Sequence, residues 1–239
     1  LMNDDQVWAP ILEQELRKAG RTDVEVYNAG VVGYTSLSNL IYLSEEIVDY
    51  KPDLIVLYNT FNDMQHANHA QPSLKRGYRR DYIYRTRPRC PNPVVTFLEN
   101  SQLFVKVRYR LMRSAPVVDE VTPVGNPVID PDGPETFERN LRSFCAVARA
   151  NGIRVFLPTQ ISYPPHVPES MKQAWFLYDA KLKAVADSNE NAEFYDLRHE
   201  IDPVPDLFTD WIHLKPAGNQ AVAEHLAKEL LKRPAMLPP

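Results

Sequence analysis

Cysteine is scarce in this sequence of 239 residues, and long apolar runs are missing. The two cysteines, Cys90 and Cys145, have no metal-ligand spacing and are too few for a disulfide framework, although one bridge between them stays open. No stretch approaches the roughly 18 apolar residues of a membrane span. No signal-peptide pattern opens the chain, and the first residues lead directly into a helix pattern, so we expect the numbering to begin inside a domain. These absences leave the compartment undetermined.

A dominant charge of one sign is also missing. The formal net charge of −4 gives no overall reason to expect a nucleic-acid partner. The composition, 44% hydrophobic and 24% charged, is that of an ordinary globular protein, and the length suits one large α/β domain or two small ones. A chain of this length buries a sizeable core without disulfides or metals.

Apolar residues recur at helical spacing in several stretches and form short continuous runs between them. The predicted helices span residues 7–19, 36–50, 135–150, 168–188 and 217–232. The predicted strands span residues 24–30, 53–59, 153–158 and 192–197. Strands that alternate with helices predict a parallel sheet covered on both faces. The simplest account is one domain over residues 1–239 with a long irregular insertion at about residues 64–134.

Three Asp-x-x-His pairs follow predicted strands, where the sites of parallel sheets lie. They are Asp63/His66, Asp196/His199 and Asp210/His213. We expect Asp196 to point into the sheet edge or to cap the next loop. Asp210 and His213 lie in the loop before the last helix, where the imidazole could be held as a general base with the carboxylate as its orienter. The plainer interpretation is that Asp210 only caps the turn.

Two further segments carry groups suited to binding negative charge. The stretch NAGVVGYTS, residues 28–36, has glycines at Gly30 and Gly33 between a strand and a helix, where a backbone N–H can approach a ligand oxygen. It lacks the dinucleotide and P-loop spacings, which opposes a nucleotide-binding function. Asn62 follows the next strand, and its side-chain N–H could face developing negative charge. Taken singly, the glycine segment is explained by a tight turn, and the segment of Asn62 is explained by an Asx turn.

In order along the chain, these segments read N-A-G-x-x-G-x-[ST], then x-N-D, then D-x-x-H-L-x-x-x-G. Together with KPDLIVL before the Asn, this order resembles the SGNH (GDSL) hydrolase family. The resemblance implies a three-layer α/β/α flavodoxin-like fold and hydrolysis of a small-molecule ester or thioester through an acyl-serine, without metal or cofactor. It assigns oxyanion-hole N–H groups to Gly33 and Asn62, the general base to His213 and its orienting carboxylate to Asp210.

Two departures from the family pattern bear on activity. Thr60 stands where the family has the Gly of G-x-N-D. The family's Gly-x-Ser is also missing before the first predicted helix, so we expect the nucleophile upstream of Leu1. Ser36 and Ser38 are the nearest substitutes, but they lie where a helix N-cap is expected. The chain is then either part of an active hydrolase, inactive as it stands and lacking a central strand, or a non-catalytic relative that serves as a binding module.

The predicted insertion contains a basic segment, residues 75–113, with eleven Lys and Arg residues but only two acids. The plain interpretation is a solvated face paired with the acidic remainder. Sharper alternatives are a lid that steers an anionic substrate and a contact with an anionic membrane surface. His66 and His69 have helical spacing for a metal, but no third ligand is evident nearby. An extracytoplasmic or membrane-anchored location is suggested only by the resemblance.

Overall fold

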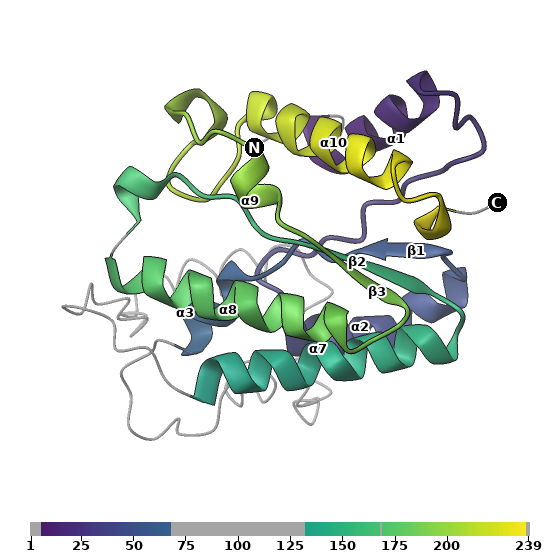
Figure 1. The fold of residues 1–239 in the computed structure, drawn as a ribbon, viewed down its shortest axis with the longest axis horizontal. Coiled ribbons are helices and arrows are strands. Elements are labelled where there is room, and N and C mark those ends of the chain that lie inside the picture. Colours follow the sequence, from purple (N-terminus) through teal and green to yellow (C-terminus); the bar gives the residue numbers. More distant parts are fainter. Residues whose placement is uncertain (1–5, 68–131, 168, 238–239) are drawn as a thin grey trace, which may run out of the picture.

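A parallel sheet forms the middle layer of the computed structural model, which describes residues 6–67, 132–167 and 169–237. In these residues the strands are β1 (Leu54–Val56), β2 (Arg154–Pro158) and β3 (Ala192–Tyr195), side by side in this order (Figure 1). Both β1 and β3 pair with β2 in parallel. The carboxyl ends of the strands therefore lie at the same edge of the sheet.

Helices cover both faces of this sheet (Figure 1). One layer holds α1 (Trp8–Lys18) and α10 (Pro216–Leu231), which pack against each other. The opposite layer holds α2 (Ser36–Glu45), α7 (Asp132–Ala150) and α8 (Glu169–Asp187). The short helical segments are η2 (Ile47–Tyr50), α3 (Phe61–Ala67), η4 (Pro164–His166), α9 (Leu197–Glu200), η5 (Pro205–Leu207) and η6 (Pro234–Met236). The expected α/β architecture with a parallel sheet between helices is confirmed.

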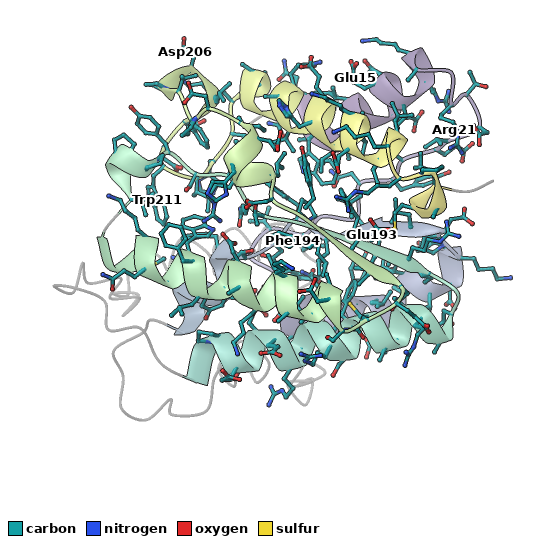
Figure 2. All side chains as sticks on the ribbon, in the orientation of Figure 1. Glu15, Arg21, Glu193, Phe194, Asp206 and Trp211 are labelled. Carbon is teal, nitrogen blue, oxygen red and sulfur yellow. The ribbon has the colours of Figure 1, made fainter. Side chains whose placement is uncertain are left out.

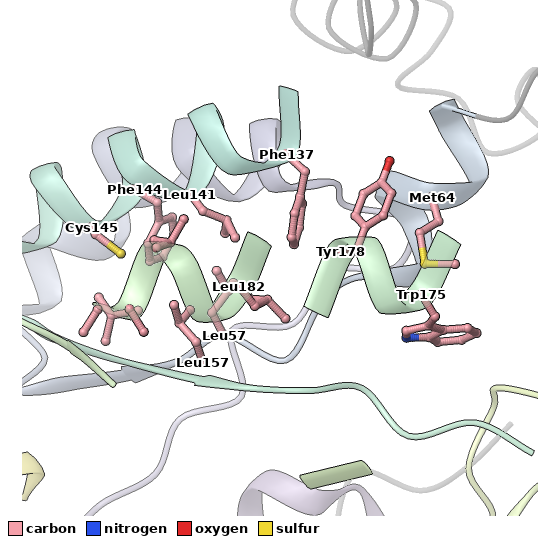
Figure 3. Packing of buried hydrophobic residues seen from close by; sticks show 14 of the residues in the cluster. Leu57, Met64, Phe137, Leu141, Phe144, Cys145, Leu157, Trp175, Tyr178 and Leu182 are labelled. Carbon is pink, nitrogen blue, oxygen red and sulfur yellow. The ribbon is translucent and has the colours of Figure 1, made fainter. Parts of the chain in front are cut away.

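The alternation of side chains along β2 builds two separate hydrophobic cores. Val155 and Leu157 point into the core beneath α7 and α8, whereas Phe156 points into the core beneath α1 and α10. All three side chains are fully buried, which is why the strand reads as an unbroken apolar run. Figure 3 shows the first core, where Leu157 of the sheet faces Leu141 of α7 and Leu182 of α8.

One predicted strand is not formed. Residues 24–30 have no ladder partner within the described residues and are irregular. Side chains of α1 take up backbone groups of this segment instead: Glu13 Oε2 accepts from Val26 N at 2.7 Å, and Arg17 Nε donates to Val24 O at 3.2 Å. A segment counts as a strand only when a neighbour completes its hydrogen bonds, and an apolar pattern alone does not supply that neighbour.

Several predicted boundaries also need correction. The helix expected over residues 36–50 breaks into α2 and η2, and Lys51 after it adopts a left-handed φ of 50°. Residues 64–67 and 132–134, which were expected to be irregular, are helical in α3 and α7. The rest of the predicted insertion, including the basic segment and Cys90, lies outside the described residues. Cys145 is buried in the core of Figure 3, with a thiol that is free among the described residues.

Candidate active site

Asp210 and His213 form the pair that their spacing predicts. The distance between Asp210 Oδ2 and His213 Nδ1 is 2.6 Å. The other carboxylate oxygen, Oδ1, accepts from the backbone N–H groups of Ile212 and His213, both at 2.8 Å. The His213 side chain is 75% exposed. Since Nδ1 is engaged by the carboxylate, Nε2 is the ring nitrogen left to exchange a proton with another group.

The same contacts keep the Asp210 carboxylate ionised. Partial burial acts to raise its pKa, but hydrogen bonds from the backbone N–H groups of His213 and Ile212 and from the His213 ring outweigh that effect. The pKa of Asp210 therefore lies below its ordinary value. A carboxylate that stays ionised at neutral pH can stabilise an imidazolium beside it.

The loop that carries this pair is closed at its base. Phe208 and Leu214 form an antiparallel bridge, and Thr209 N donates to His213 O at 2.7 Å. Gly218 of α10 lies directly against this base, because a Cβ on it would come within 2.3 Å of Leu207 O. The glycine of the D-x-x-H-L-x-x-x-G phrase thus allows the helix to approach the loop closely.

On the other side of the candidate site, Asn62 contacts the glycine turn at the residue after Gly33. Asn62 Nδ2 donates to the carbonyl oxygen of Tyr34, the residue after Gly33, at 2.8 Å. Asn59 Nδ2 donates to the same oxygen at 3.0 Å. Gly33 has a φ of 77°, which a residue with a side chain rarely adopts. One N–H of the Asn62 amide is used in this contact, and the amide carries a second one.

Ser36, a substitute nucleophile, is engaged elsewhere. Its hydroxyl donates to Asp63 Oδ1 and accepts from Asn140 Nδ2 at 3.0 Å, and all three residues are buried. Its backbone N–H donates to Asp63 Oδ2 at 2.9 Å. This network ties the start of α2 to α3 and α7. Ser38 lies in the first turn of α2. Its backbone N–H donates to the side-chain oxygen of Thr35, the N-cap residue, at 3.4 Å.

An aromatic contact joins the two sides of the candidate site. The rings of Phe61 and Trp211 meet edge to face, with centroids 4.8 Å apart. Phe61 directly precedes Asn62, and Trp211 lies between Asp210 and His213. Figure 2 shows Trp211 at the end of the molecule toward which the strands run, far from Arg21 at the opposite end.

The Asp-x-x-His spacing alone does not single out one pair. Asp196 Oδ2 lies 2.7 Å from His199 Nδ1, and the His199 side chain is 70% exposed. Of the two positions expected for the Asp196 side chain, the structure shows the one toward the sheet edge: its Oδ1 accepts from the hydroxyl of Thr159, the residue after β2, at 3.3 Å, and it makes no side-chain cap of α9. What distinguishes the loop of His213 is its contact through Trp211 with the residue beside Asn62. Asp63 belongs to the buried network with Ser36, and the His66 side chain lies outside what the structure describes.

Sequence reasoning missed Gln160. This residue follows β2, and its side-chain oxygen accepts from the first N–H groups of α3, at 3.2 Å from Thr60 N and 2.9 Å from Phe61 N. Its position beyond the carboxyl end of a buried strand is the signal that could have found it, because the same rule singled out Asn62.

Metal and membrane features were searched within the described ranges. There, no three His, Cys, Asp or Glu side chains are placed to share a metal ion. No helix in the same ranges combines the length and the apolarity needed to cross a membrane.

Comparison with protein families gives one extensive match. The family model described as GDSL-like Lipase/Acylhydrolase family matches residues 2–221. No curated protein sequence matches the chain significantly.

Solved structures with the same fold match nearly the whole chain. The crystal structure of AlAXEase, an acetyl xylan esterase, has a TM-score of 0.60 at 17% identity, and the match covers 95% of this chain and 91% of that one. TesA has a TM-score of 0.60 at 19% identity, with coverages of 99% and 92%. A catalytic mutant of Axe2, an acetylxylan esterase from Geobacillus stearothermophilus, has a TM-score of 0.59 at 14% identity, with coverages of 94% and 80%. These similarities establish the three-layer fold of GDSL (SGNH) hydrolases for this chain.

Proposed function

Because the chain belongs to the GDSL-like lipase/acylhydrolase family, we propose that it provides the base and oxyanion side of a serine ester hydrolase. His213 is the general base, and Asp210 orients its ring. The side-chain N–H of Asn62 and the backbone N–H of Gly33 form the oxyanion hole. The observation that carries the proposal is the Phe61–Trp211 contact, which joins the loop of His213 to the residue next to Asn62.

The reaction follows from these roles. A serine hydroxyl attacks the ester carbonyl carbon while His213 Nε2 takes the hydroxyl proton, and the carbonyl electron pair moves onto the oxygen as an oxyanion. Donors at Asn62 and Gly33 stabilise that charge. When the intermediate collapses, His213 returns the proton to the departing alcohol. Water then repeats the sequence on the acyl-serine, releasing the acid and restoring the serine.

The nucleophilic serine belongs, in this proposal, to a strand and turn encoded upstream of Leu1. Two observations support this assignment. Ser36, the serine nearest to the glycine turn in sequence, is held in the buried network with Asp63 and Asn140. Within the described residues, β1 pairs with β2 on one side only, so its other edge can accept a further strand.

Acetylated carbohydrate is the first substrate class to test. Two of the similar structures are acetyl xylan esterases by their titles. Acyl lipids and thioesters are the next classes. The basic segment, residues 75–113, lies outside the described residues, and contact with an anionic substrate or an anionic membrane surface remains a proposal for it. Salt-sensitive binding to anionic liposomes would favour the membrane, and no binding at low salt would exclude it.

A non-catalytic binding module is the second candidate function. Thr60 occupies the family's glycine position, and its hydroxyl is buried without a hydrogen-bond partner among the described residues. A buried hydroxyl without a partner, two residues before Asn62, would be tolerated more easily in a protein that does not have to bind an oxyanion.

One experiment separates these functions. The full-length gene product and the 239-residue chain are treated with a fluorophosphonate probe and assayed with p-nitrophenyl acetate. We expect labelling and turnover only for the full-length protein, and both should disappear in its His213→Ala variant. A full-length protein that neither reacts with the probe nor turns over the ester supports the binding module. Equal, His213-dependent turnover by the shorter chain contradicts the upstream serine.

A further inference from the structure

We infer that Gln160 is a positioning residue for the oxyanion donor Asn62, an inference that rests on the function proposed above. Gln160 does not itself donate to the oxyanion in this scheme. It holds the start of α3, the helix that begins one residue before Asn62.

The side chain of Gln160 fixes the first turn of α3 from outside the helix. Its Oε1 accepts from Phe61 N at 2.9 Å and from Thr60 N at 3.2 Å. The first N–H groups of a helix have no partner inside it, so an acceptor from another element decides how the end is held. Gln160 is about one hundred residues away along the chain, with a sequence separation of 99 from Phe61. It therefore acts as a long-range cap.

The backbone of Gln160 is clamped in turn. Its carbonyl oxygen accepts from Arg198 at two points, Nε at 2.9 Å and Nη2 at 2.7 Å. Arg198 also pairs with Asp179, with 2.9 Å between Nη1 and Oδ2, and both side chains are largely buried at 17% and 16% exposure. The guanidinium carbon lies 4.6 Å from the centre of the Trp175 ring, so the cation is stacked as well as paired. A guanidinium held on three sides has little freedom to release the carbonyl.

These contacts form one path from the sheet to the oxyanion donor. Arg198, which follows β3, holds the backbone of Gln160 after β2, and the Gln160 side chain holds the helix of Asn62. Asn62 in turn reaches the glycine turn through Tyr34 O at 2.8 Å. A donor stabilises an oxyanion only when it already lies at hydrogen-bond distance from the place where charge develops, so small displacements of α3 act on the rate rather than on substrate binding.

The test compares three full-length variants by their steady-state kinetics. Gln160→Glu keeps an acceptor oxygen at the same reach, whereas Gln160→Leu removes it with little change in volume. Gln65→Leu is the matched control, because Gln65 is an exposed residue of α3 itself. We expect Gln160→Leu to lower kcat by about 10- to 100-fold with little change in KM. Gln160→Glu should restore most of kcat, and Gln65→Leu should behave as the wild type.

A second readout separates this inference from the proposed function. Hydrogen exchange at the Thr60 and Phe61 amides reports the cap without any catalysis: exchange should accelerate in Gln160→Leu and stay slow in Gln160→Glu. A wild type without esterase activity refutes the proposed function, and unchanged exchange in Gln160→Leu refutes the cap. An active, folded Gln160→Leu with wild-type kcat overturns the positioning role while the function stands. If Gln160→Leu does not fold, Gln160→Asn, whose acceptor is one carbon shorter, must show the same loss of kcat or the inference fails.

Discussion

Phe61 and Trp211 are 150 positions apart in the sequence and meet edge to face, with their ring centroids 4.8 Å apart. Trp211 also meets Trp175 of α8, at 6.0 Å between centroids, so the pair is anchored to the core of Figure 3. Phe61 begins α3 directly before Asn62, and Trp211 belongs to the loop that carries His213. Within the described part of the chain, the spacing between the Asn62 side and the His213 side therefore depends on this aromatic packing.

We expect Phe61→Leu and Trp211→Leu to act non-additively. An edge-to-face pair contributes about 0.5–1.5 kcal/mol beyond the area it buries. A double-mutant cycle on the free energy of urea unfolding should return a coupling of that size, and in the full-length enzyme each variant should lower kcat more than it raises KM. Additive effects on both stability and kcat would show that α3 and the loop of His213 are positioned independently.

His213→Ala should abolish ester hydrolysis by the full-length protein, with a loss of about 10³-fold or more in kcat. The matched control is His199→Ala. Its ring makes a similar Asp–His contact, at 2.7 Å against 2.6 Å, but belongs to the other exposed pair. We expect His199→Ala to keep kcat within a few-fold of the wild type. If His199→Ala lost more kcat than His213→Ala, His199 would be the catalytic base instead.

Gly218→Ala should destabilise the protein because the added Cβ would lie 2.3 Å from the Leu207 carbonyl oxygen. Overpacking against backbone costs about 1–3 kcal/mol and here would push α10 away from the loop of His213. Gly30→Ala serves as the control, since its Cβ would approach only the Asn28 side chain, at 3.1 Å. The free energy of unfolding of both variants is measured in urea. If Gly218→Ala were as stable as Gly30→Ala, the loop at Leu207 would be able to move away from the added Cβ without cost.

Thr60→Val should stabilise the protein by about 1 kcal/mol, because the buried hydroxyl of Thr60 has no partner among the described residues. Thr159→Val is the opposite case with the same chemical change. Thr159 Oγ1 accepts from Arg198 N at 2.8 Å and donates to Asp196 Oδ1 at 3.3 Å. Its replacement should cost about 1–3 kcal/mol in the free energy of unfolding. A destabilised Thr60→Val would reveal a partner for that hydroxyl.

The stability of the protein should depend on pH through Asp179. Burial raises the pKa of this carboxyl to about 7, although Arg198 acts in the opposite direction. Between about pH 4 and pH 7 the folded protein then binds more protons than the unfolded chain, whose aspartates titrate near pH 4. The free energy of unfolding therefore falls as the pH rises through this window. Asp179→Asn should flatten that slope in urea titrations between pH 4 and about pH 8; an unchanged slope would assign it to other groups.

Local patterns were enough to predict most elements and one half of the candidate site. The runs in β1, β2 and β3 and the apolar stripes of α1, α7, α8 and α10 follow the period of their own backbone. Asp210 and His213 are three residues apart, so one turn of chain brings them together. Asn62 and Gly33 were singled out because they follow predicted strands, and Asn62 donates to Tyr34, the residue after Gly33.

The tertiary structure decided what distant residues do to each other. Gln160 caps α3, Trp211 packs on Phe61 and Ser36 is buried with Asp63 and Asn140, and none of these contacts lies within one turn of chain. It also decided against a strand over residues 24–30, since a ladder needs a partner that apolar periodicity cannot specify. Sequence by itself determines how each segment is patterned, because that depends on neighbours a few residues away; which patterned segments touch depends on how the whole core packs.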